Sequence, residues 1–318
     1  MVANFLIGVT DIMSVNGIDE RQNKDENINL LAAQRQLYSE AKKLMRWQFI
    51  VAVILPMILF FIKPLYINNV QYLAYLTIGS LIMLFVGNFC FEKSIAAKRL
   101  NAAKIQELFD VHVLQMEWNN EICGRENEIY KIINVKMNKY KKHHKTINDL
   151  SKWYPVDYAS INIDAARIMC QRVNIYWDSE VRQNLINILK IILGLYILGS
   201  VAFLCYENMG FAESMVSFIL PLSSIVIYII RKIEENVTTM MNLQKLSGML
   251  EGGIWNLAMN HNSSKEDLEK ASKMLQNMLF KHRSSCALIW DFFYSWRRKQ
   301  QENNSNYEAK QIVNKFNI

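Results

Sequence analysis

Four uncharged and strongly apolar runs dominate the pattern of hydrophobic and polar residues along the chain. They cover residues 47–62, 64–91, 191–206 and 214–230, and charged residues bound each of them. A membrane-spanning helix needs about 20 apolar residues, with about 17 to 25 observed. The pattern therefore predicts four transmembrane helices, three of them at the short end of this range.

The four runs pair into two hairpins, over residues 47–91 and 185–230, because only short loops separate the members of each pair. Aromatic and lysine residues flank the runs, and such side chains reach toward lipid headgroups. These flanking residues are Trp47, Lys63, Tyr66, Tyr72, Lys190 and Tyr206. The alternative is a pair of buried hairpins in a soluble protein, which would need a large soluble coat around them.

The distribution of basic residues predicts the orientation of these hairpins. Of the 36 lysine and arginine residues, only Lys63 lies in a hairpin loop. Cytoplasmic segments carry the excess of basic residues, so both termini and the central polar block are expected in the cytoplasm. The predicted fold class is an all-α membrane protein with two transmembrane helical hairpins and helical cytoplasmic modules between and after them. Its predicted segments are 1–46 (N-terminal cytoplasmic segment with a helix), 47–91 (first hairpin), 92–184 (helical cytoplasmic domain), 185–230 (second hairpin) and 231–318 (helical cytoplasmic tail).

The polar blocks are expected to be helical. Residues 92–150 contain no proline and a single glycine, Gly124, where we expect a bend. The sequence Trp153-Tyr154-Pro155 ends this stretch, because the residue before a proline is driven out of the α region. Further helices are predicted over residues 162–183, 231–255 and 265–282. The first of these leads directly into the third apolar run.

Composition and charge exclude several classes of function. The chain has 318 residues, 51% of them hydrophobic, and a formal net charge of +7. The positive-inside bias accounts for most of this charge, so we expect no DNA or RNA polymer as a partner. The five cysteines form no CxxC pair and the five histidines no HExxH motif, so no metal site, cofactor or enzyme activity is expected. No signal peptide is expected, because the first twelve residues lack a basic start and a small-residue cleavage site.

A polar stripe runs along the predicted helix 162–183. Arg167, Gln171, Asn174 and Asp178 are spaced i, i+4, i+7 and i+11, which places them on one helical face. Arginines, amides and a neighbouring tryptophan suit a nucleotide, through phosphate contacts and base stacking. The alternative is a hydrogen-bonded polar seam between cytoplasmic helices. The candidate ligand-binding residues are Trp153, Arg167, Gln171, Arg172, Asn174, Trp177, Asp178 and Arg182.

Small and polar residues inside the apolar runs are candidates for a pore or gate. Pro56 and Pro221 each lie ten residues from the predicted cytoplasmic edge, so both would kink a helix near the membrane midplane. Polar residues in the runs equally suit simple helix packing. No ionisable group lies within the runs, which disfavours an ion-coupled transporter. The candidate pore or gating residues are Pro56, Ser80, Gly87, Asn88, Ser217, Pro221 and Ser224.

Three other segments have more than one interpretation. The basic run Lys139–Lys145 is either a solvated helix end or a contact for the inner leaflet or a polyphosphate. The aromatic and arginine-rich segment Trp290–Arg298 suits either an amphipathic piece on the inner leaflet or an oligomer interface. Gly248 and Gly252, spaced i and i+4, would permit close contact between helices.

Two sequence blocks resemble the SMODS-associated four-transmembrane effector family. The first contains Arg21-Gln22-Asn23, the stretch Leu30–Ser39 and Ala41-Lys42. The second contains Trp153-Tyr154-Pro155, Ala166-Arg167, Cys170-Gln171-Arg172, Asn174, Trp177-Asp178 and Arg182. Residues 1–12 precede the family pattern, and the tail matches it only at Arg283-Ser284-Ser285 and Phe293-Tyr294.

The resemblance implies a pore-forming effector of bacterial CBASS anti-phage defence in the inner membrane. In such systems a partner nucleotidyltransferase makes a cyclic oligonucleotide, and the effector then disrupts the membrane, so that the cell stops growing or dies. Four spans enclose no large pore, so a homo-oligomer is expected. The alternative is a non-conducting membrane scaffold that oligomerises and recruits a cytosolic partner.

Overall fold

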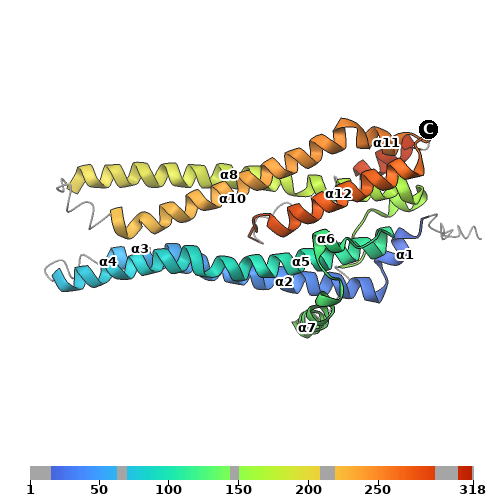
Figure 1. The fold of residues 1–318 in the computed structure, drawn as a ribbon. Helices are drawn as coiled ribbons and strands as arrows, with labels where there is room; N and C mark the ends of the chain where they lie inside the picture. Colours follow the sequence, from blue (N-terminus) through green and yellow to red (C-terminus); the bar gives the residue numbers. More distant parts are fainter. Residues whose placement is uncertain (1–15, 63–69, 144–149, 208–218, 291–306, 317–318) are drawn as a thin grey trace, which may run out of the picture.

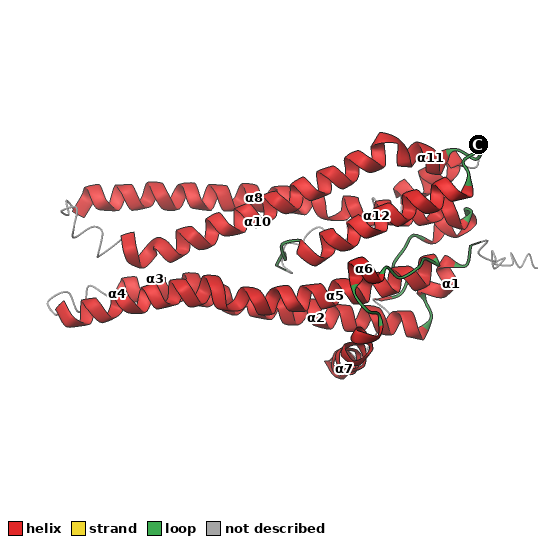
Figure 2. Ribbon diagram, viewed as in Figure 1, coloured by secondary structure: helices red, strands yellow, loops and turns green. Residues whose placement is uncertain are grey.

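The computed structural model describes residues 16–62, 70–143, 150–207, 219–290 and 307–316. All regular secondary structure in these ranges is helical, as Figure 2 shows, which confirms the all-α prediction. The helices form two long layers that run side by side (Figure 1). Each layer contains two antiparallel helical rods, whose apolar ends lie on one side of the molecule and whose polar helical extensions lie on the other.

The first layer consists of two long helical rods that follow the short helix α1 (Ile18–Gln22). In one rod, α2 (Asp25–Phe49) continues through the π-helical turn η1 (Ile50–Ile54) into α3 (Leu55–Ile62). In the other, α4 (Val70–Phe85) continues through the π-helical turn η3 (Val86–Cys90) into α5 (Phe91–Leu114). The two π-helical turns lie against each other where the rods pack.

Helix α5 ends earlier than the sequence predicts. Gln115 adopts a left-handed conformation with φ of 54°, and its N–H caps the carbonyl of Val111. Neither glycine nor proline marks this position, so the sequence gives no sign of the break. Two further helices follow: α6 (Asn120–Cys123) and α7 (Asn127–His143), with the expected bend at Gly124 between them. Figure 1 shows α7 nearly end-on while α2 and α5 run across the view, so α7 lies crosswise to the rods.

The second layer begins after the short 3-10 helix η5 (Val156–Ser160). Helix α8 (Ile163–Glu207) has 45 residues and joins the predicted cytoplasmic helix to the third apolar run without interruption. Helix α10 (Leu220–Met249) continues through the π-helical turn η7 (Leu250–Ile254) into α11 (Trp255–Met259). Helix α12 (Lys265–Ser285) starts at the predicted cap, where Ser264 Oγ accepts a hydrogen bond from the N–H of Asp267 at 3.1 Å.

The segment after α12 crosses back to the other helices. Arg99 of α5 donates to the carbonyls of Ser284 at 2.9 Å and Cys286 at 3.0 Å. Trp290 lies edge-on to Phe49 of α2, with ring centroids 5.3 Å apart. Trp290 is thus held at the junction of the two layers, while the rest of the predicted aromatic segment lies outside the described residues.

The main hydrophobic core lies at the end of the molecule near α1 and α12. One buried cluster joins α2, α5, α7, residues 150–161, α8 and the helical residues 307–316. A second joins α8, α10, α11 and α12. This end therefore has a packed apolar interior that several helices share.

The opposite end exposes large apolar side chains. Tyr75, Phe85 and Leu195 are each at least 60% exposed, and many neighbours resemble them. Other exposed apolar residues are Met57, Ile58, Ile78, Leu81, Ile82, Phe89, Ile191, Leu198, Val201 and Ile227. Within the described residues, one helical segment, Arg182–Phe203, is long and apolar enough to cross a membrane, and only 11% of its apolar window is buried. Apolar patches of this extent mark contact with lipid or with another protein.

Candidate functional site

The polar stripe of α8 faces neighbouring helices, and Arg167 caps the end of α5. Its Nε donates to the carbonyl of Leu114 at 2.7 Å, and Nη2 donates to the carbonyl of Gln115 at 2.7 Å. The last carbonyls of a helix lack intrahelical partners and carry the negative end of its dipole, so a guanidinium is well suited to them. Asp164 completes the contact with an ion pair at 2.9 Å. Arg167 thereby connects α8 to α5.

Gln171 and Asn174 continue this seam. Gln171 is fully buried, and its Nε2 donates to the carbonyl of Ser272 at 3.0 Å and to Oε1 of Gln276 at 2.9 Å, both on α12. Asn174 Nδ2 donates to the Tyr154 hydroxyl at 3.3 Å. The stripe therefore holds together α8, α12 and the segment before η5, as the seam interpretation predicts.

The remaining candidate ligand-binding residues occupy different places. Arg182 is buried and donates to Oδ1 of Asn236 on α10 at 3.0 Å. Arg172 lies on another face of α8, where it pairs with Glu308 at 2.9 Å and covers the ring of Trp255 at 4.9 Å. Trp153 is half-buried, edge-on to Phe109, with 6.1 Å between ring centroids. The side chains of Trp177 and Asp178 lie outside the described residues.

A buried polar cluster lies where α5, α8 and α12 meet, and we call it the Asp110 cluster. Its members are Glu107, Asp110, Tyr154, Gln276 and Arg283. Asp110 is fully buried; it accepts hydrogen bonds from Tyr154 Oη at 2.6 Å, Gln276 Nε2 at 3.0 Å and Arg283 Nη1 at 2.6 Å. Gln276 Nε2 also donates to Glu107 Oε2 at 2.8 Å. Since Gln171 and Asn174 bond to Gln276 and Tyr154, the stripe of α8 and this cluster form one network.

Burial controls the protonation of this cluster. Desolvation, and then the negative charge of Asp110, raise the pKa of Glu107 to about 8. Burial and Asp110 also raise the pKa of the Tyr154 hydroxyl well above its ordinary value. Glu107 is therefore largely protonated near neutral pH, which leaves a single buried ion pair between Asp110 and Arg283.

The sequence analysis missed most of this cluster. Glu107, Asp110 and Gln276 are absent from its candidates, and Arg283 enters only through the family tail pattern. A signal was nevertheless present, because Glu107 and Asp110 are spaced i and i+3, and Gln276 and Arg283 are spaced i and i+7. Each pair thus shares a helical face with apolar neighbours.

Substituting Glu107 with glutamine is expected to remove a pH dependence of stability. The folded protein retains a proton at a pH where the unfolded chain has released it, because the pKa rises from 4.5 to about 8 on folding. This stabilisation is complete below about pH 4.5 and is lost as the pH rises to about 8. The free energy of unfolding, measured by chemical denaturation in detergent across this interval, should therefore fall with pH in the wild type.

Glu107→Gln should flatten that slope, because an amide does not ionise. Glu121→Gln, which alters an exposed side chain, is the matched control and should retain the slope. An unchanged slope in Glu107→Gln would show that this carboxyl does not take up a proton on folding.

The candidate gating residues that the structure describes lie at the exposed apolar end. Gly87 lies in η3, where an added Cβ would come within 2.9 Å of the Cβ of Ala52 in η1. Ala52 belongs to a small apolar cluster with Leu222 and Ile225 of α10, so the two hairpins pack together here. Pro56, Ser80 and Ser224 are also buried. Pro221 lies in the first turn of α10, but its side chain, the side chain of Asn88 and residue Ser217 lie outside the described residues.

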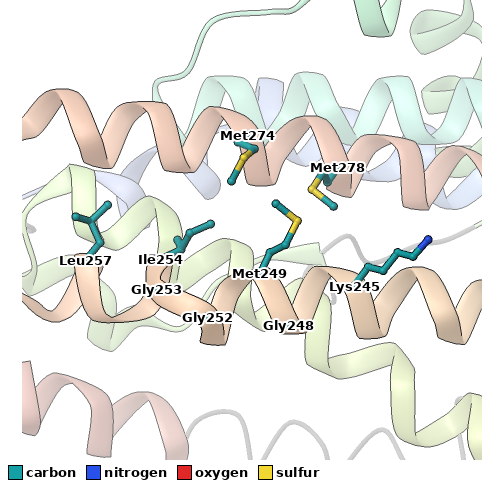
Figure 3. A pocket seen from close by; sticks show the side chains of 9 residues that line it. All are labelled: Lys245, Gly248, Met249, Gly252, Gly253, Ile254, Leu257, Met274 and Met278. Carbon is teal, nitrogen blue, oxygen red and sulfur yellow. The ribbon is translucent and has the colours of Figure 1, made fainter.

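An open apolar groove lies between α10–α11 and α12 (Figure 3). It has a volume of about 720 Å³, and Figure 3 shows the methionines of both helices on either side of it. Its lining residues are Lys245, Gly248, Met249, Gly252, Gly253, Ile254, Leu257, Met274 and Met278. Apart from its chain neighbours and its own helix backbone, no described atom lies within 4 Å of where a Cβ on Gly248 or Gly252 would be, so the described residues do not make the close helix contact that this spacing would permit.

The sequence of the chain matches a known protein family over most of its length. The model of the SMODS-associating 4TM effector domain matches residues 16–312, which is nearly the whole chain. The chain belongs to this family. The match confirms the resemblance drawn from the two sequence blocks, and it includes α8, the Asp110 cluster and both apolar hairpins.

A curated relative agrees with this membership. A probable CBASS effector molecule of Bacillus cereus (strain VD146) is 27% identical over 290 residues, which is 89% of this chain and 93% of the relative. No solved structure matches the chain. Membership in the 4TM effector family supports an effector role in CBASS anti-phage defence and a membrane location, and the family is not known as an enzymatic one.

Proposed function

We propose that this 4TM effector is a pore-forming protein that crosses the bacterial inner membrane four times and disrupts it on activation. The observation that carries the proposal is the exposed apolar surface at the far end of both hairpins. In water such a surface would be unfavourable, at about 25 cal/mol for each Å² of exposed apolar area. A lipid bilayer removes that cost, and the scarcity of basic residues in the hairpin loops supports a cytoplasmic location for both termini.

The activating ligand in this proposal is a cytosolic cyclic oligonucleotide from a partner nucleotidyltransferase. We assign its binding to the α8 seam and its surroundings: Trp153, Arg167, Gln171, Arg172, Asn174, Trp177, Asp178 and Arg182. In the described structure Arg167 binds carbonyls at the end of α5. A phosphate group that competes for this guanidinium would weaken the connection between α5 and α8.

A weakened connection between α5 and α8 would act directly on the membrane-spanning segments in this proposal. α5 follows the second apolar run and α8 contains the third, and no loop separates the cytoplasmic part from the apolar part in either case. A ligand shifts such an equilibrium only by binding the active arrangement more tightly. The driving force here would be the exchange of Arg167 contacts from α5 carbonyls to ligand phosphates.

The conducting path in this proposal is formed by several copies of the chain, because four helices enclose no large pore. Its candidate residues remain Pro56, Ser80, Gly87, Asn88, Ser217, Pro221 and Ser224. The π-helical turns η1 and η3 support a role for this region, since such turns occur frequently at functional sites.

The test is dye release from liposomes that contain the purified full-length protein. We expect release with one member of a panel of cyclic di- and trinucleotides and little release without ligand. Arg167→Ala and Arg172→Ala should each weaken ligand binding. If both variants bind ligand and release dye like the wild type, the site assignment is wrong. If no cyclic nucleotide causes release although one binds, the pore proposal is wrong.

The open methionine-lined groove favours a second candidate, a non-conducting scaffold that recruits a cytosolic partner. A flexible, methionine-rich surface is typical of adaptable protein binding. The scaffold predicts no dye release, and it predicts loss of function when charges enter the groove, as in Met249→Asp with Met274→Asp. Removing the chain after residue 284 would be a poorer test, because it would also remove the Cys286 carbonyl that Arg99 of α5 binds.

A further inference from the structure

Three lysines converge on a single carboxylate at the junction of α2, α5 and α7. Glu40 of α2 accepts from Lys98 of α5 at 2.9 Å, and from Lys136 and Lys139 of α7 at 2.7 and 2.8 Å. Gln36 adds a fourth donor at 3.1 Å. We call Lys98, Lys136 and Lys139 the lysine triad.

The triad carries more positive charge than Glu40 can neutralise. Burial alone would raise the pKa of Glu40, but the hydrogen bonds from the three lysines hold that pKa well below its usual range. One full negative charge therefore faces three positive charges. Lys98 and Lys136 contact the same carboxylate oxygen, so their ammonium groups are close neighbours and repel each other. A second anion at this place would remove that repulsion.

Within the described residues, the triad has further N–H donors and an open side. An ammonium group has three N–H donors, and Glu40 occupies one donor of each lysine. The Lys136 side chain is 19% exposed, Lys98 is 30% exposed and Lys139 is 49% exposed. The site is thus built by packing on its inner side and is accessible from outside at Lys139.

The triad lies close to the apolar end of the molecule. Glu40 precedes the first apolar run by seven residues, and Lys98 follows the second run by seven residues. At 1.5 Å per residue, both lie about 10 Å beyond the apolar surface along the helix axes. The polar headgroup layer on one side of a bilayer is about 5 to 8 Å thick. Long lysine side chains at this height reach the phosphates of that layer.

We propose that the lysine triad is a binding site for a phosphate group, with Glu40 holding the three ammonium groups in place. Its position beside the headgroup layer rests on the proposed membrane orientation, but its charge and geometry do not. The phosphate can belong to an anionic lipid headgroup or to a free phosphate compound. Helix α7, which lies crosswise to the rods (Figure 1), would then rest against the inner leaflet.

The experiment compares anion binding by full-length wild type, Lys98→Gln/Lys136→Gln and a matched control. The control is Lys270→Gln/Lys281→Gln, which removes the same charge from exposed positions on α12, away from the basic run 139–145. One arm uses nanodiscs of phosphatidylcholine with or without phosphatidylglycerol and measures the thermal unfolding temperature. The other arm titrates inorganic pyrophosphate into detergent-solubilised protein without anionic lipid and measures its affinity calorimetrically.

We expect binding by the wild type and the control, and at least about tenfold weaker binding by the triad variant. A response to phosphatidylglycerol alone assigns the site to lipid, and a response to pyrophosphate assigns it to free phosphate. Equal responses of the triad variant and the control, or no response of the wild type in either arm, would overturn the proposal. If the triad variant fails to unfold cooperatively, the more exposed Lys139→Gln takes its place. Neither readout involves dye release, so failure here is distinct from failure of the proposed pore.

Discussion

Replacing Arg283 with methionine is expected to destabilise the protein by about 3 to 5 kcal/mol, the range for breaking a buried ion pair on one side. Asp110 is fully buried, and Arg283 donates to it at 2.6 Å. Without the guanidinium, the Asp110 carboxylate would remain in the interior with only a hydroxyl and an amide as donors. Chemical denaturation in detergent, followed by far-ultraviolet circular dichroism, would measure the loss.

Two further variants test whether the effect comes from charge. Lys281→Met removes an exposed cation from the same helix and should change stability by less than about 0.5 kcal/mol. Asp110→Asn in the Arg283→Met background should recover part of the loss, since the uncompensated charge is gone. Wild-type stability of Arg283→Met would show that the Asp110 cluster does not hold the helices together.

Gly87→Ala is expected to destabilise the contact between the two apolar rods by about 1 to 3 kcal/mol, the usual cost of overpacking. The added Cβ would come within 2.9 Å of Ala52 Cβ and 3.1 Å of its Cα, so a backbone has to move. Gly87→Leu should have a larger effect, because it adds three more carbons at the same place. Thermal unfolding in detergent measures both changes, and dye release from liposomes measures the effect on function.

Two other positions in the same rods provide a control and a compensating substitution for Gly87→Ala. Gly79 lies in the same rod, and outside its own helix backbone and chain neighbours no described atom lies within 4 Å of an added Cβ, so Gly79→Ala should be neutral or slightly stabilising. Ala52→Gly removes the clashing methyl and should restore Gly87→Ala toward wild type. If Gly79→Ala and Gly87→Ala behave alike, the close approach of η1 and η3 does not determine stability.

The hydrophobic pattern predicts most of the fold, because each apolar run and each flanking polar helix has its own local signal. The uninterrupted course of α8 from its polar part into the apolar run and the Ser264 cap both follow from the sequence. The end of α5 at Leu114 does not, because a glutamine in the left-handed conformation is maintained by its surroundings. Arg167, far away in sequence, binds the carbonyls exposed by that break.

The candidate site is predictable only in part, because spacing shows which residues share a face but not what that face contacts. The stripe of Arg167, Gln171 and Asn174 is correct as a helical face. Its partners come from α5, α12 and the segment before η5, and no local pattern connects these elements. Asp110 shares a helical face with apolar residues, but nothing local in the sequence shows that Arg283 of α12 pairs with its charge in the interior.

The unbroken course of α8 fixes the rotational phase between its two halves. Successive residues of an α-helix are rotated by about 100° about its axis. Inserting one residue between Ile175 and Leu185 would therefore turn the exposed apolar surface by about 100° relative to the face that holds Arg167. Inserting or deleting seven residues, which is close to two full turns, would nearly restore the original angle between the apolar surface and the Arg167 face. The length of this stretch is thus under a constraint of its own, separate from the identity of its side chains.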